Sequence, residues 1–416
     1  MSERIFEAPG PGTWTTDGTH LPKPLSRYSS SMGGDGTRRG FIEGTERYGV
    51  LFSHTVGTAI HDFWYAKSVF AGIPEDAPPG PLPPGFFDQP EIETRLRNGP
   101  KAIKEKLWRE DLRRWDEEVK PDSIRRHQEL QAVDLTSLDT DGLIDHLQTC
   151  YDNITEMWYR HHIFTVGCIF PVGLYLVKMG EWTEVSSGEA LAALKGSSPV
   201  SLGVAYQELQ HLAKLLREAG IEASQFENQS AADTLTELRS IPGPIGAAVE
   251  AYLEIVGYQL TSGYDITERF ALETPEILIT GIFSVLSNPD QVSNDEVDEI
   301  TRVLRNRVPE GNRAEFDSLL VEARLVNRLR DERGVYNEGK AFGLARRAVL
   351  EAGRRLQQAG SLHDANALVH ASHEEMLAML RGQSGPSETE LRERENWYNT
   401  MTCDDVPGLL GPPPEP

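Results

Sequence analysis

The sequence predicts an all-α protein, built as one large multi-helix domain or two helical subdomains, with an extended N-terminal arm. Helix-forming segments with apolar residues at helical spacing recur along the chain, and the alternating pattern of strands is scarce. The chain has 416 residues, of which 39% are hydrophobic and 25% are charged, which fits a soluble globular protein.

Residues 321–356 form the most strongly helical stretch, rich in Ala, Leu, Arg and Glu. Its second half has an apolar stripe at helical spacing, with arginines and Glu351 on the opposite side. The stripe consists of Phe342, Ala345, Ala348, Val349, Ala352 and Leu356. The first half carries a rotated stripe that includes Leu329, and the change of direction near Gly334 and Gly339 indicates a break or bend.

Further helices are predicted along most of the chain. Either Asp139 or Thr140 is a suitable N-cap for a helix over residues 142–160, and Pro171 is expected to kink or end the helix that reaches it. The remaining predicted helices cover residues 91–131, a segment ending at 216, and residues 245–259, 268–288, 294–307, 312–335 and 363–381.

Composition divides the chain into three parts. Residues 1–40 are rich in Gly, Pro, Ser and Thr and predict an extended arm, residues 41–382 form the helical domain, and residues 383–416 form a polar and then Pro-rich linker or tail. Within the domain, residues 44–72 are rich in aromatic side chains.

Charge and hydropathy exclude several classes of protein. The formal net charge of −23 argues against a nucleic-acid surface, which requires a basic stripe. The N-terminus has no apolar signal region, and the most hydrophobic run, residues 163–177, contains Pro171 and is too short to span a bilayer. We therefore expect a cytoplasmic protein without a membrane partner.

Two pairs of adjacent residues are candidates for proton transfer. His61 and Asp62 lie in the aromatic stretch, and His161 and His162 precede the most apolar run. A histidine in apolar surroundings is also commonly a satisfied core residue, so both interpretations remain open. His370 and His373 have helical spacing that suits metal binding, but no third ligand is evident, and we expect no metal site.

Several segments together resemble one family. They are Arg330-Asp331-Glu332-Arg333, Tyr336, residues 344–349 and 353–356, the Gly-Tyr-Asp segment within residues 257–279, residues 20–32, and the Pro-rich tail LLGPPPEP. These segments resemble phosphoenolpyruvate synthase-like phosphotransferases, of the rifampin phosphotransferase and the phenylphosphate or cresol-phosphate synthase types. In that family a nucleotide-grasping part charges a histidine, and a large helical domain holds the hydroxyl acceptor.

The resemblance implies an acceptor-substrate-binding subunit or fragment of an ATP-dependent, dikinase-type phosphotransferase. Its substrate would be an aromatic hydroxyl compound, phenol-like or larger. No Walker-type loop, nucleotide-grasping half or phosphohistidine segment is evident in the chain. The resemblance therefore implies that this chain binds no cofactor itself, and that ATP, Mg²⁺, an ATP-binding subunit or domain and a phosphohistidine domain belong to the complete system.

The resemblance and the residue types together define the predicted site. The predicted catalytic residues are His61, Asp62, His162, Arg330 and Arg333, as proton acceptors and as charge for the transferred phosphoryl group. The predicted substrate-binding residues are Phe63, Trp64, His161, Phe164, Tyr264, Asp265, Arg269 and Tyr336. Two alternatives remain open: a non-catalytic helical module that binds an aromatic ligand, and a scaffold without a small-molecule site.

Overall fold

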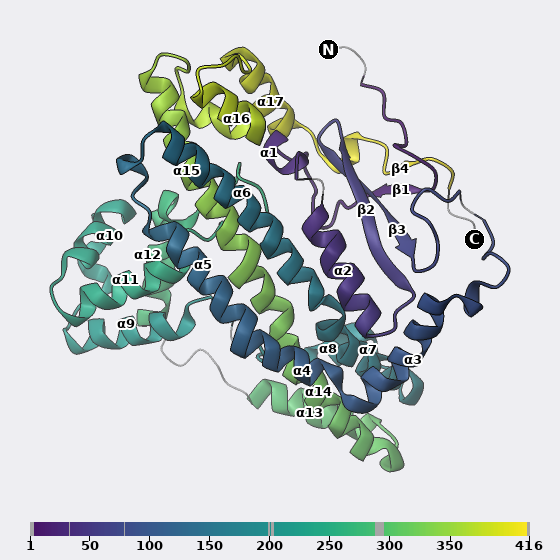
Figure 1. Cartoon of the computed structure of the whole chain (residues 1–416). Coiled ribbons are helices and arrows are strands. Elements are labelled where there is room, and N and C mark those ends of the chain that lie inside the picture. Colours follow the sequence, from purple (N-terminus) through teal and green to yellow (C-terminus); the bar gives the residue numbers. More distant parts are fainter. Residues whose placement is uncertain are drawn as a thin grey trace.

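Helices make up most of the molecule, and a small antiparallel sheet lies on one side (Figure 1). This computed structural model describes residues 4–32, 34–78, 80–198, 200, 204–287 and 295–413. The prediction of a mostly helical protein is confirmed, but the all-α class is corrected by the four-stranded sheet. The helices are α1 (Arg27–Ser30), α2 (Asp35–Arg47), α3 (Pro90–Glu105), α4 (Leu107–Arg114), α5 (Lys120–Ala132), α6 (Thr140–Ile163), α7 (Thr165–Trp182), α8 (Ser187–Leu191), α9 (Tyr206–Glu218), α10 (Ala231–Ser240), α11 (Pro244–Val256), α12 (Pro275–Ser287), α13 (Asp295–Arg307), α14 (Arg313–Gly334), α15 (Lys340–Gln358), α16 (His373–Leu380) and α17 (Glu388–Thr400). The strands are β1 (Trp14–Thr16), β2 (Phe52–Ile60), β3 (Phe63–Phe70) and β4 (Leu409–Leu410).

The largest core lies between α6 and α15, which run side by side with α5 and α14 through the centre of the molecule (Figure 1). The stripe from Phe342 to Leu356 predicted from the sequence is buried in this core. The N-cap prediction for α6 is also confirmed, because the Asp139 side chain accepts a hydrogen bond from the backbone N–H of Gly142. Pro171 does not end its helix: it lies inside α7, and the break falls earlier, at Phe164.

Close contact between α2 and α6 depends on three glycines of α2. Gly36, Gly40 and Gly44 are spaced four residues apart and therefore lie on one face of the helix. A Cβ atom added at Gly40 would lie 2.6 Å from the backbone oxygen of Tyr159, and the other two glycines approach the α6 backbone as closely. The glycines therefore allow α2 to hold the end of α6, where the two histidines lie.

A π-helix, Val335–Gly339, joins α14 to α15. A π turn contains one residue more than an α turn, so the side chains that follow are rotated by roughly 100° relative to those before. This rotation is the physical reason for the change in stripe direction that the sequence places near Gly334 and Gly339. A second π-helix, Trp115–Val119, joins α4 to α5 and was not predicted.

The aromatic stretch that follows α2 is a long β-hairpin. Strands β2 and β3 pair with Ile60 opposite Phe63, so His61 and Asp62 are the two-residue loop. Both loop residues have positive φ, 49° and 74°, as a type I′ turn requires. The sheet order is β2-β3-β1-β4, with all the neighbouring strands antiparallel.

Both ends of the chain contribute to the sheet. The segment predicted as an extended arm supplies β1 and α1, and its predicted boundary at residue 40 falls inside α2. The segment predicted as a polar and then Pro-rich linker or tail contains α17 and then β4. Arg394 of α17 pairs with Glu375 of α16, which fixes this segment on the helical domain. Residues 414–416 lie outside the described part.

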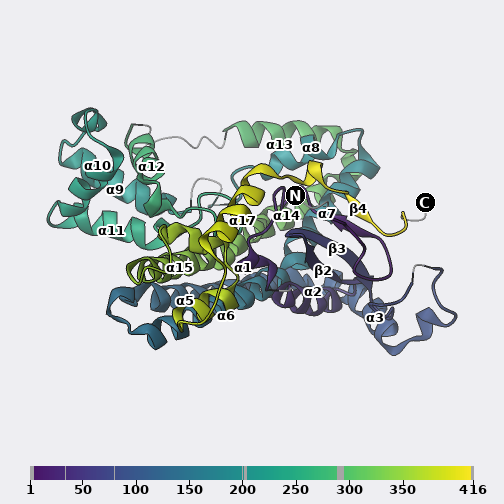
Figure 2. The ribbon, with the colours of Figure 1, turned by 90° about the horizontal axis from the view of Figure 1, so that it is seen from above.

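Helices α9 to α12 form a separate group with its own apolar core (Figure 2). They lie on the far side of the central helices from the sheet. α10 ends at Ser240, and α11 begins at Pro244, one residue before the helix predicted over residues 245–259. This group borders the π-helix Val335–Gly339 through Gln259, whose side-chain amide donates to the carbonyl oxygen of Val335.

The apolar run Thr140–Trp182 is long and apolar enough to cross a membrane, and 44% of its most apolar window is buried inside the protein. Core helices of soluble proteins have the same length and composition. Leu143, Met157 and Tyr175 of this run are buried in the cores, which supports a core role for these residues. The cytoplasmic location remains a prediction.

Candidate functional site

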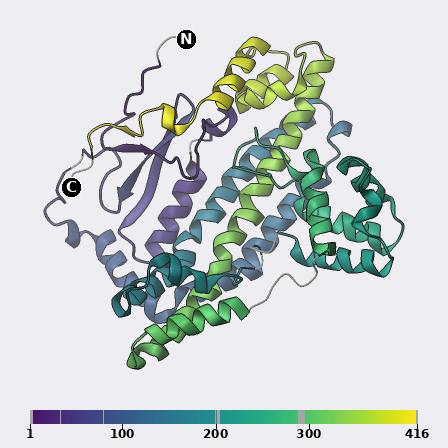
Figure 3. The same cartoon turned by 180° about the vertical axis from the view of Figure 1, so that it is seen from behind.

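The end of α6, the end of α14 and the π-helix Val335–Gly339 bring together four of the residues predicted from the sequence. They are His161, His162, Arg333 and Tyr264, and a further residue, Glu338, joins them. Figure 3 shows α14 and α15 as a nearly continuous green run that passes α6. We call these five residues and Trp158 the histidine–glutamate cluster.

The centre of the cluster is a buried carboxyl group against an imidazole. Nδ1 of His161 lies 2.6 Å from Oε1 of Glu338, and the Glu338 side chain is fully buried. Apart from this contact, neither atom has a hydrogen-bond partner among the described residues. Two acceptor atoms at this distance repel unless a proton lies between them, so the pair shares a proton.

Burial decides where that proton resides. Burial raises the pKa of Glu338 well above its usual range, and burial also lowers the pKa of His161 well below its usual range. At neutral pH the carboxyl group therefore holds the proton, and the imidazole is neutral. Loss of one proton leaves a carboxylate that holds Nδ1–H and an imidazole with a free Nε2 lone pair, which is the form of a general base.

His162 is held between two aromatic rings. Its ring stacks on Phe41 at 4.4 Å and on Trp158 at 5.7 Å. Burial lowers its pKa well below the usual range, so this imidazole is neutral too. The stacking makes His162 part of an aromatic wall, and its nearest polar contact is Thr165, whose hydroxyl lies 3.4 Å from Nδ1.

Arg333 brings a buried positive charge to the cluster. It is 8% exposed, and its guanidinium donates to two neutral acceptors, the carbonyl oxygen of His161 and the hydroxyl of Thr165. Among the described residues no carboxylate lies within ion-pair distance of it, and its Nε has no partner. An uncompensated buried charge is costly, so this guanidinium is suited to bind an anion.

Tyr264 and Trp158 form the accessible aromatic side of the cluster. Their rings meet edge to face at 5.8 Å, and Tyr264 is 37% exposed. The loop that carries Tyr264 is fixed by Asp265, whose carboxylate accepts from the backbone N–H groups of Ser26 and Thr267. Asp265 was predicted to bind substrate, but its oxygens are committed to the backbone of this protein.

His61 and Asp62 lie in the hairpin turn and contact other groups. Nε2 of His61 bonds the carbonyl oxygen of Ile5, and the buried carboxylate of Asp62 pairs with Arg27 at 3.0 Å. Both were predicted to be catalytic, whereas the turn directs His61 to the N-terminal segment and Asp62 to α1. Both have structural partners in the described part of the chain.

The remaining predicted residues divide between core and surface. Phe63 is buried beside Trp397, and Phe164 is buried against Trp115, so both are core residues. Trp64 lies over Gly57 of the neighbouring strand. Arg269 is exposed.

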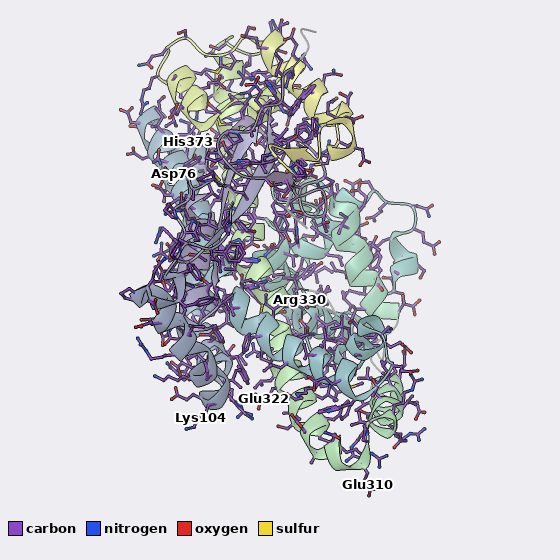
Figure 4. The ribbon with its side chains drawn as sticks, turned by 90° about the vertical axis from the view of Figure 1, so that its right-hand side faces the viewer. Asp76, Lys104, Glu310, Glu322, Arg330 and His373 are labelled. Atoms are coloured by element: carbon purple, nitrogen blue, oxygen red, sulfur yellow. The ribbon has the colours of Figure 1, made fainter. Side chains whose placement is uncertain are left out.

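Arg330 and Tyr336 lie outside the cluster. The side chain of Arg330 is 64% exposed, and Figure 4 shows it on α14 between Glu322 and the C-terminal end of that helix. Tyr336 lies under the ammonium group of Lys120 at 4.3 Å. Glu332, from the same charged segment, is a structural residue, because Trp115 and Lys120 both donate to it.

Sequence reasoning missed Glu338, Trp158 and Phe41. Glu338 lies two residues after the predicted Tyr336, between the two glycines that mark the bend, and an acidic residue at a helix irregularity is a usable signal. Trp158 precedes the histidine pair by one helical turn, so its contact with His162 follows from spacing alone. No signal in the sequence indicates Phe41, because it comes from a distant helix.

The described residues contain no group of three or more His, Cys, Asp or Glu side chains arranged to hold a metal ion. His373 instead stacks on Tyr151 at 4.3 Å, and its Nε2 bonds Gln148. Comparison of the chain with models of known protein families and with curated proteins found no match.

Proposed function

We propose that this chain binds the hydroxyl acceptor of an ATP-dependent phosphotransferase, and that the histidine–glutamate cluster is where the acceptor reacts. The phosphoryl group would arrive on a phosphohistidine carried by another domain or subunit. The acceptor would be an aromatic hydroxyl compound. The resemblance of several segments to phosphoenolpyruvate synthase-like enzymes supports the reaction class, and the geometry of the cluster supports the location.

The observation that carries the proposal is Arg333. A buried guanidinium without a carboxylate partner, beside a carboxyl–imidazole pair, offers charge to a phosphoryl group and a base to a hydroxyl group at one place. Phosphoryl transfer depends mainly on positioning and on neutralising charge at the transferred group. Arg333 supplies the charge, and its contact with the His161 carbonyl fixes it relative to the base.

The proton balance assigns a role to His161 and Glu338. The base is the form of the pair that has lost one proton, in which Nδ1 carries the proton and Nε2 is free. As the acceptor oxygen bonds to phosphorus, the bond from phosphorus to the carrier histidine breaks, and the hydroxyl proton passes to this free Nε2 of His161. The Glu338 carboxylate holds the proton on Nδ1 and stabilises the imidazolium that forms. A phenol has a pKa of about 10, like that of tyrosine, so the base need not be strong.

The aromatic walls determine the class of acceptor. Trp158, Tyr264 and the stacked His162 present ring faces and edges beside the base. Aromatic rings favour offset-stacked and edge-to-face partners by about 0.5–1.5 kcal/mol beyond the burial of area. A ring-bearing hydroxyl compound is therefore favoured over an aliphatic alcohol of similar size.

Calorimetric titration of the full chain with phenyl phosphate and with phenol tests the proposal. Phenyl phosphate is expected to bind, and Arg333→Met should weaken it by roughly 10- to 100-fold, because a hydrogen bond to a charged group contributes about 1.5–3 kcal/mol. Phenol affinity should change much less. Arg330→Met, on the exposed side of the same helix, is the matched control and should leave both affinities unchanged.

The result also separates the alternative function. If phenol binds and phenyl phosphate does not, the chain is a binding module for aromatic ligands and Arg333 has no phosphoryl role. If Arg333→Met weakens phenol and phenyl phosphate equally while its circular dichroism is unchanged, Arg333 only supports the fold of the site. Either result rejects the proposal.

A further inference from the structure

A cavity lies beside the π-helix Val335–Gly339. It has a volume of about 400 Å³ and opens between α5, α9, α11 and the π-helix Val335–Gly339. Ligand sites in proteins commonly have volumes of about 300–1,000 Å³, so this cavity can hold a small molecule. It lies where the α9–α12 group meets the central helices, and junctions of this kind are frequent ligand sites.

The deepest polar group in the cavity is the ammonium of Lys340. Lys340 is 7% exposed, and its Nζ donates to the carbonyl oxygen of Glu254. An ammonium has three N–H donors, so two remain for another acceptor. Among the described residues no carboxylate forms an ion pair with Nζ, and the Glu254 carboxylate favours the charged form from a longer distance.

A second polar group lines the cavity without a partner. His127 is 1% exposed, and its Nε2 has no hydrogen-bond partner among the described residues. Burial and the nearby Lys340 lower the pKa of His127 to about 3, so the imidazole is neutral at physiological pH. In the Nε2–H form it can donate one hydrogen bond.

The other lining groups define the shape of the ligand. Ile124, Val335 and Ile255 form apolar walls. Glu208 and Glu254 also line the cavity, and the Glu254 carboxylate accepts from Gln128 at 2.6 Å. Two carboxylates oppose a doubly charged anion, and one ammonium with one neutral donor matches the two oxygens of a monoanion.

We propose that this cavity binds a small monocarboxylate with an apolar body, with the carboxylate against Lys340 and His127 and the body between α5 and α11. The site is distinct from the histidine–glutamate cluster. It does not depend on the proposed phosphotransferase function.

The pH dependence of binding follows from the charged groups around Lys340. They are His127 on α5, Glu208 on α9, Glu254 on α11 and Tyr336 on the π-helix. Burial lowers the pKa of Lys340 to about 8 in the free protein. The ligand needs the ammonium form, so affinity is constant below pH 8 and falls as the pH rises above it, by about tenfold per unit.

Calorimetric titration of the full chain with benzoate tests this site, and benzamide is the neutral probe of the same shape. We expect benzoate to bind at pH 7 and benzamide to bind at least roughly tenfold more weakly, because the charge-assisted contact is lost. Lys340→Met should remove the preference for benzoate. Ala251→Phe, at the exposed rim, should block the binding of both probes while the Lys340 ammonium is retained. Lys178→Met, which replaces a surface lysine, should leave the affinities for both probes unchanged.

The outcomes are separable. The proposal is overturned if benzoate fails to bind at millimolar concentration, if Lys340→Met binds benzoate as the wild type does, or if Ala251→Phe has no effect. It is also overturned if Arg333→Met abolishes benzoate binding while Lys340→Met preserves it, since benzoate would then occupy the other cluster. Unchanged benzoate binding in Arg333→Met, with loss in Lys340→Met, supports it.

Discussion

The Glu338→Gln variant tests whether the buried carboxyl group is held neutral. Glutamine has nearly the same shape, and its amide can donate to Nδ1 of His161 as a protonated carboxyl group does. A carboxyl group whose pKa is higher in the folded state than in the unfolded chain favours the unfolded chain as the pH rises, because only the unfolded chain ionises. Glu338 therefore lowers stability at neutral pH, and its replacement should raise it.

The magnitude follows from proton linkage. One pH unit corresponds to about 1.4 kcal/mol for each proton that the folded state retains and the unfolded state has lost. Between pH 5.5 and 7.5 the variant should therefore gain about 2.7 kcal/mol relative to the wild type, provided the folded carboxyl group stays protonated over that range. His161 acts in the opposite sense, because its lowered pKa makes the folded state less stable only below its unfolded pKa of about 6.5.

Urea unfolding of both proteins at several pH values measures this difference. Glu322→Gln is the matched control. Glu322 is also a buried residue, but it accepts from Lys106, Trp108 and Arg109, which together lower its pKa to about 2. Its replacement should destabilise the protein by roughly 1.5–3 kcal/mol at pH 7. If Glu338→Gln also destabilises the protein, with no gain as the pH rises, Glu338 and His161 form an ordinary ion pair and the reasoning is refuted.

Three further predictions address packing, the hairpin and the nucleotide. Gly40→Ala should destabilise the protein by about 1–3 kcal/mol, because its Cβ would meet the α6 backbone. The control is Gly173→Ala, in an open position of α7, which should stabilise the protein by up to about 1 kcal/mol. If both substitutions change the stability equally in thermal unfolding, the close contact between α2 and α6 is contradicted. His61→Asn should change stability by less than about 1 kcal/mol and leave phenyl phosphate affinity unchanged, because asparagine suits a type I′ turn; a loss of affinity would return His61 to the site. Titration of the chain with Mg-ATP should show no heat of binding, and micromolar affinity would refute the assignment of the nucleotide site to another part of the system.

The helices were predictable, and the hairpin was not, for physical reasons visible in particular residues. The apolar residues from Phe342 to Leu356 recur at helical spacing and all face the same core, so their spacing predicted the buried face of the helix. The run from Phe52 to Phe70 is rich in β-branched and aromatic residues, a strand signal, but its turn has no Asn-Gly or Asp-Gly pair. His61 and Asp62 both have positive φ although neither is glycine, so the sequence does not indicate a turn at these two residues.

The candidate site was only partly predictable because it combines local and distant contacts. His161 and His162 stand out by composition, and Arg333 and Tyr264 come from segments that carry the family resemblance. Their meeting depends on the close α2–α6 contact and on the rotation introduced by the π-helix, neither of which follows from composition. The pairing of Glu338 with His161 also required the register of that π-helix to be known.

The π-helix gives both proposed sites a common physical origin. A π turn is less favourable than an α turn, and such turns persist mainly where their geometry serves a function. Here the extra residue allows neighbouring positions to face different surroundings: Glu338 contacts His161, while Val335 and Tyr336 line the cavity that holds Lys340. An α-helical turn would rotate Glu338 away from α6 by roughly 100° and separate it from the imidazole. The Glu338–His161 pair and the cavity beside Lys340 thus both depend on the same five residues, so a substitution that restores regular α-helix there should disturb both sites together.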